Sequence, residues 1–223
     1  MIDHANTSSA THQNSVANLA ERNQIRSSLH ALNEKLINNK AENVLSALQE
    51  ISSLGSQAHL FVPKIVALSN NNNKTIRQAA ISALGKLRSD EKLIIFTVKK
   101  CLHDEEVDIR RSAASTLAQF TSSSSSAVYD LADRVINDDD PVVQELCCHA
   151  LAEMGSDAHP ALPALVQHLQ HGNNAQRIAA CRTISKIGIH ADMAKPALIQ
   201  ALQDSNTHVR NFASTALGAV TTL

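Results

Sequence analysis

One short pattern returns along this chain at a nearly constant interval. Its first position falls at Ile76, Ile109, Val143, Gln176 and Val209, so the successive intervals are 33, 34, 33 and 33 residues. Alanine and leucine follow at matching distances in most copies. A fixed period in this range is typical of stacked supersecondary units, which bury their apolar faces against one another. The chain is therefore predicted to form one elongated repeat domain and not a single globular core.

Each interval contains two apolar segments with helical spacing, separated by a short polar turn. Proline falls in the first turn of several of the first segments, where a helix has no N–H bond to lose. The predicted fold class is all-α, an α-solenoid of about six antiparallel helix pairs. We expect residues 1–14 to be a flexible polar tail and residues 15–223 to be the repeat domain, beginning with an N-terminal capping helix. The predicted pairs span 25–54, 58–87, 91–120, 124–154, 158–187 and 191–220.

Composition bounds what the domain can bind. The chain has 20 basic and 21 acidic residues, a formal charge of −1, and only 2% aromatic residues with no Trp. Nucleic-acid or membrane binding is not expected, because the chain has no basic excess and few aromatic side chains that could stack on bases. The N-terminus lacks a basic, apolar leader, and no run of about 18 apolar residues exists. The four cysteines lie in apolar helical runs, so buried free thiols and a cytoplasmic location are predicted.

The polar turns between the two helices of each pair carry Asp or Asn, which are helix N-cap residues. Shortly after the turn, the second helix usually carries an arginine. We expect these arginines and the acidic turns to form a ladder of charge-assisted bonds between neighbouring repeats, a structural role. Its members are Arg77, Arg110, Arg177 and Arg210, with Gln144 in the equivalent place once.

The acidic turn, the proline-bearing first helix and second helices such as Ile76-Arg77 to Gly85 together resemble HEAT repeats. The resemblance is closest to the short HEAT-like repeats of the bilin-lyase type and covers about residues 25 to 220. It implies an α-solenoid that usually binds partners along a concave face lined by the second helices. It does not imply one function.

The repeat register predicts which side chains of the second helices are exposed on that face. They are polar and of mixed charge, which suits a protein interface better than a small-molecule pocket. The alternative is that they form ordinary solvated helix faces. The predicted partner-binding residues are Arg111, Ser115, Glu145, His149, Glu153, Arg182 and Lys186.

No set of residues indicates catalysis, and neither a cofactor nor a metal is expected. His168 and His171 share a helix face, but no carboxylate or cysteine recurs beside them at ligand spacing. They are interpreted as surface histidines.

The sequence thus predicts a non-enzymatic scaffold or adaptor for one or more protein partners. An alternative is a bilin (phycobiliprotein) lyase-like, chromophore-handling protein, in which Arg111, Arg182 and Lys186 could hold tetrapyrrole propionates. Residues 191–223 end in a pair rich in apolar side chains. An exposed apolar patch there would indicate contact with another subunit or a second copy of the chain.

Overall fold

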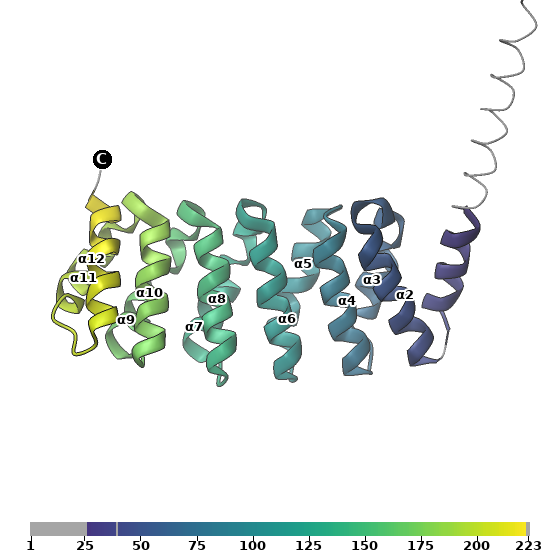
Figure 1. Ribbon diagram of the computed structural model, residues 1–223, viewed down its shortest axis with the longest axis horizontal. Helices are drawn as coiled ribbons and strands as arrows, with labels where there is room; N and C mark the ends of the chain where they lie inside the picture. Colours follow the sequence, from purple (N-terminus) through teal and green to yellow (C-terminus); the bar gives the residue numbers. More distant parts are fainter. Residues whose placement is uncertain (1–25, 39, 222–223) are drawn as a thin grey trace, which may run out of the picture.

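A computed structural model describes residues 26–38 and 40–221. Within them the chain forms an elongated row of antiparallel helix pairs, and no strand is present (Figure 1). The first pair is a helix over residues 26–36 followed by α2. The predicted tail and residues 15–25 of the predicted cap lie outside the described residues. The other helices are α2 (Ala41–Leu54), α3 (Val62–Leu68), α4 (Lys74–Leu87), α5 (Glu91–Cys101), α6 (Val107–Leu117), α7 (Val128–Asn137), α8 (Pro141–Glu153), α9 (Leu162–His171), α10 (Asn174–Ile187), α11 (Lys195–Ala201) and α12 (Thr207–Thr221).

The predicted α-solenoid is confirmed. Its second helices α2, α4, α6, α8, α10 and α12 each contact the next one along the row and form one layer. The first helices lie behind them in Figure 1. Four short 3₁₀ segments, Gly55–Phe61, Ala118–Ala127, Gly155–Ala161 and Gly188–Ala194, connect most pairs to the next.

The core runs continuously along the array because equivalent residues repeat from pair to pair. Ala80, Ala113, Cys147, Ala180 and Ala213 are one such column, and every member is fully buried. Their small side chains let successive second helices pack closely. A neighbouring column of larger residues fills the space between the layers: Leu84, Leu117, Leu151 and Ile184 are also fully buried. Burying each of these larger side chains contributes about 1.5–3 kcal/mol.

The turns inside the pairs supply the N-caps that the sequence predicts. The side chains of Asn73, Asp140 and Asn173 accept hydrogen bonds from the first N–H groups of α4, α8 and α10. Asn173 forms a full capping box with Gln176. These bonds satisfy donors that a helix start leaves without a partner.

The links between pairs require an unusual backbone. Gly55, Gly155 and Gly188 occupy equivalent places after a second helix and have φ of 55°, 58° and 68°. Glycine adopts this region without strain. Arg88 and Thr121 occupy the same place with φ of 47° and 45°, so side chains stand where glycine is favoured. At Thr121, ψ is −126°, close to the −134° of Gly55.

Candidate functional site

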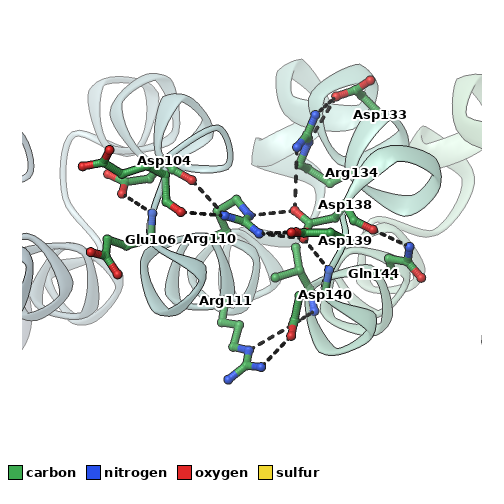
Figure 2. Close-up of polar contacts among 12 residues, drawn as sticks. Asp104, Glu106, Arg110, Arg111, Asp133, Arg134, Asp138, Asp139, Asp140 and Gln144 are labelled. Carbon is green, nitrogen blue, oxygen red and sulfur yellow. Dashed lines mark hydrogen bonds and ion pairs between the residues drawn. The ribbon is translucent and has the colours of Figure 1, made fainter.

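The arginines expected in the ladder lie against the acidic turns of the following helix pair. Arg110 donates from Nε and Nη2 to the two carboxylate oxygens of Asp138, over 2.8 and 3.0 Å (Figure 2). Arg77 binds Asp104 in the same two-point manner, over 3.1 and 3.0 Å. Arg177 binds Asp204 over 2.8 and 2.9 Å. Planar guanidinium groups match carboxylates in this way, which sets the rotation of one pair against the next.

Each of these arginines also stabilises its own turn. Nη1 of Arg110 donates to the Asp104 carbonyl oxygen over 3.0 Å, and Nη1 of Arg77 donates to the Asn71 carbonyl oxygen over 2.9 Å. The acceptor carboxylates are engaged too, since Asp138 accepts from the N–H of Asp140 over 3.0 Å. Arg77, Arg110 and Arg177 therefore each have a carboxylate partner inside the fold.

The electrostatics of Asp138 reflect this arrangement. Burial alone raises the pKa of its carboxyl group. The hydrogen bonds from Arg110 and from the Asp140 N–H, with the nearby charges of Arg110 and Arg134, outweigh burial and hold the pKa below its usual range. The pKa of Asp204 is likewise lowered, chiefly by its hydrogen bond from Arg177.

Among the residues that the structure describes, Gln144 and Arg210 have no carboxylate partner in a following turn. The turn after Gln144 carries His171 where the turns after Arg77, Arg110 and Arg177 carry Asp104, Asp138 and Asp204, so an arginine would have no carboxylate partner there. Gln144 instead donates to the Asp138 carbonyl oxygen over 2.7 Å and accepts from Gln176. Arg210 bonds only within its own turn, including the Asp204 carbonyl oxygen at 2.7 Å.

The residues predicted to bind a partner separate into two groups. Arg111 and Ser115 lie on α6, and Arg111 is held by Asp140 of the next turn, over 3.0 and 2.7 Å (Figure 2). The other five lie together around one groove between α8 and α10, with a cavity of about 380 Å³. The groove is lined by Val142, Glu145, Leu146, Cys148, His149, Ala152, Glu153, Ala179, Arg182, Thr183 and Lys186.

The two walls of the groove differ in charge. Glu145 and Glu153 extend from α8, whereas Arg182 and Lys186 extend from α10, with His149 on the α8 side. All five side chains are exposed. Among the described residues, none of these five side chains forms a hydrogen bond or an ion pair. This sets them apart from Arg77, Arg110 and Arg177 of the ladder, which are each paired with a carboxylate.

The floor of the groove is mainly apolar. Leu146, Ala152 and Ala179 are half-buried there. Thr183 joins the two helices, because its hydroxyl donates to the carbonyl oxygens of Cys148, over 3.0 Å, and Ala179, over 2.9 Å. Burial raises the pKa of the Cys148 thiol to about 12, so this sulfur is not a nucleophile at neutral pH. Sequence reasoning missed the floor, although the small residues Ala152 and Ala179 are visible in the repeat register.

The two histidines of α9 differ in burial from each other, whereas the four cysteines are alike. His168 was predicted to lie at the surface, and that is wrong: it is 7% exposed and faces the core side of α9, whereas His171 is exposed. Its helix face is buried because α9 packs between α7 and α11. All four cysteines are buried free thiols, as predicted. Within the described ranges, no group of three or more metal-ligating side chains could hold an ion.

Two exposed aromatic residues lie on the first helices and were not singled out in the sequence. Phe96 on α5 is 52% exposed and Tyr129 on α7 is 72% exposed. They occupy the register place that holds Pro63, Pro163 and Pro196 in other repeats, which is the signal that could have found them. The ammonium group of Lys100 lies 4.1 Å from the centre of the Phe96 ring.

Comparison with known proteins identifies the family. The family described as HEAT repeats matches residues 95–185 and 162–222, and the chain belongs to this family. No match was found among curated proteins. None of the described helices is long and apolar enough to cross a membrane.

Solved structures of similar fold are helical repeat proteins. A designed armadillo repeat protein is 17% identical, with a TM-score of 0.62, and the match covers 86% of this chain and 99% of that one. An engineered protein is 20% identical, with a TM-score of 0.65 and coverage of 86% and 96%. The complex of CpcE and CpcF of phycocyanin lyase from Nostoc sp. PCC7120 is 20% identical, with a TM-score of 0.54 and coverage of 70% and 98%. These likenesses show the fold alone.

Proposed function

We propose that this protein is a non-enzymatic scaffold that docks a protein partner on its second-helix face, at the groove between α8 and α10. One observation carries the proposal. The charges of Arg77, Arg110 and Arg177 are paired within the fold, whereas five ionisable side chains around an apolar floor have no such partner among the described residues. A polar, solvent-accessible rim around an apolar centre is the usual anatomy of a protein interface, and charges in the rim can match those of a partner.

The neighbouring folds support this kind of role without specifying the partner. The CpcE and CpcF structure is a complex of two proteins. A further structural neighbour, described by the interaction between cadherin and β-catenin, is 17% identical with a TM-score of 0.58, and the match covers 85% of this chain and 44% of that one.

The test is affinity purification from native extract with wild-type protein and the double variant Arg182→Glu, Lys186→Glu. We expect a partner that cross-links to the groove to be retained by wild type and lost by the variant. The matched control is Ser82→Glu with Lys86→Glu, which places acids at the equivalent positions of α4. Exposed positions of this kind rarely change stability by more than about 0.5 kcal/mol. Equal retention by all three proteins would move the docking surface elsewhere, with Phe96 and Tyr129 the next surface to test.

Residues 191–223 are a second proposed contact, with another subunit or a second copy of the chain. Met193, Ile199 and Phe212 are 56%, 57% and 36% exposed. Sedimentation of wild type and of the variant Ile199→Glu, Phe212→Glu tests this. Concentration-dependent association that the variant removes supports the contact. A strict monomer, with a partner complex that leaves these residues exposed, contradicts it.

Chromophore handling is the second candidate function, supported by the two cations on one wall of the groove and by the lyase among the structural neighbours. Arg182 and Lys186 could bind the propionates of a linear tetrapyrrole. Adding biliverdin and recording its absorption spectrum tests the idea. A shift that the Arg182→Glu, Lys186→Glu variant abolishes would favour it over protein docking.

A further inference from the structure

The groove between α8 and α10 has walls of opposite charge, and this arrangement limits what can occupy it. Second helices of neighbouring repeats run parallel, with axes roughly 8–10 Å apart. Glu145, His149 and Glu153 follow one another at four-residue steps on α8, and Arg182 and Lys186 do so on α10. At about 1.5 Å per residue, Glu145 and Glu153 lie roughly 12 Å apart along the axis. The groove therefore presents an acidic stripe and a basic stripe on either side of an apolar floor.

We propose that the occupant is an amphipathic helix of a partner protein, with a cationic flank against α8, an anionic flank against α10 and a small apolar ridge on the floor. This inference rests on the proposed docking function and specifies its partner.

Backbone chemistry favours a helix over an extended segment. An extended segment must find partners for its N–H and C=O groups, and a helical groove offers no open sheet edge. Amide side chains could take that role, but the groove lining contains none. Other repeats do carry amides at equivalent positions: Gln78 and Asn211 correspond to Glu145, and Gln119 corresponds to Glu153. A helix satisfies its own backbone and needs only complementary side chains.

Charge complementarity then sets the direction of the bound helix. Turning a helix end over end, with its apolar ridge still on the floor, exchanges its two flanks. Only one direction places the cations beside Glu145 and Glu153 and the anions beside Arg182 and Lys186. The opposite direction places like charges together on both walls, which weakens binding.

The probes are three synthetic helical peptides of about 20 residues, long enough to hold a helix in isolation. All carry the same Leu and Ala ridge. One has a Lys flank and a Glu flank, one has Lys on both flanks, and one has Glu on both. We expect the two-signed peptide to bind at least about ten-fold more tightly than either of the others. Equal binding of a single-signed peptide would overturn the inference, because the charges of one wall would then contribute nothing to binding.

The direction in which the peptide helix lies in the groove can be measured independently of its affinity. With a nitroxide at the peptide N-terminus, we expect NMR signals of α8 and α10 to broaden at one end of the groove. A fourth peptide with its two flanks exchanged should bind with similar affinity and broaden signals at the other end. Unchanged broadening would overturn the inference.

Controls separate this inference from the proposed function. The Arg182→Glu, Lys186→Glu variant should lose the two-signed peptide, while Ser82→Glu, Lys86→Glu should retain it. If no peptide binds but the purified partner still depends on Arg182 and Lys186, the helical occupant is wrong and the docking proposal stands. If binding of the partner also does not depend on these two residues, both the docking proposal and the helical occupant are wrong.

Discussion

Arg110 and Asp138 form a two-point ion pair that joins one helix pair to the next. Both residues are buried, at 8% and 4% exposure, and the guanidinium donates over 2.8 and 3.0 Å (Figure 2). Asp139 adds a third contact at 2.7 Å. The equivalent Arg210 makes no bond to an acidic side chain and provides a natural comparison.

Removing Arg110 should therefore cost far more than removing Arg210. Arg110→Ala removes the two-point partner of the buried Asp138 carboxylate and leaves it only the longer, 3.7 Å contact with Arg134. Breaking a buried ion pair in this way typically costs about 3–5 kcal/mol of unfolding free energy. Arg210→Ala loses only hydrogen bonds to neutral acceptors, so we expect it to lower the free energy of unfolding by about 1 kcal/mol. Urea unfolding of both variants measures the difference. Similar losses would show that the ladder does not stabilise the stack through its ion pairs.

The ladder also predicts loss of stability in acid. The folded pKa of Asp138 is lowered by its hydrogen bonds from Arg110 and Asp140 and by nearby charges, which together outweigh burial. Its stabilisation is therefore full above the unfolded pKa of about 3.9 and is lost as pH falls through the folded pKa. Replacing the pair with Arg110→Met, Asp138→Leu should flatten the pH dependence of unfolding below about pH 4. An unchanged slope would assign acid sensitivity to other carboxylates.

His168 predicts a separate effect nearer neutral pH. Burial lowers its folded pKa below the usual 6.5. The unfolded chain then binds the proton more readily, so stability falls as pH drops below about 6.5 and levels off below the folded pKa. The variant His168→Phe should lose less stability than wild type between pH 7.5 and 5.5. His171→Phe, at an exposed position of the same helix, is the control and should behave as wild type does.

Replacing Thr121 with glycine should stabilise the fold. It holds φ of 45° and ψ of −126°, a region that costs a side chain about 1–3 kcal/mol. Thr121→Gly removes this strain, partly offset by about 0.5–1 kcal/mol of backbone entropy, so a net gain of about 1 kcal/mol is expected. Thr121→Ala keeps the strain and should not gain. Thermal unfolding of the two variants distinguishes them, and a gain by alanine would point to the side chain as the cause.

The repeat interval by itself determined the architecture. Its period placed the helix pairs, the capped turns and the buried alanine column, because each unit repeats the same local pattern and contacts mainly its neighbours. The arginines and acidic turns could also be read together, since their spacing brings equivalent turns side by side.

Only the tertiary structure decided which exposed residues gather. Arg111 and Arg182 occupy neighbouring columns of the same face, yet Arg111 is held by Asp140 while Arg182 faces the groove. The sequence does not distinguish them, because the difference depends on side chains contributed by the next repeat.

His168 shows the same limit: its three-residue spacing from His171 suggests one exposed face. Packing of α9 between its neighbours buries the first histidine and leaves the second in solvent. Periodicity sets which residues are equivalent, whereas the contacts between particular neighbours set what each equivalent residue does.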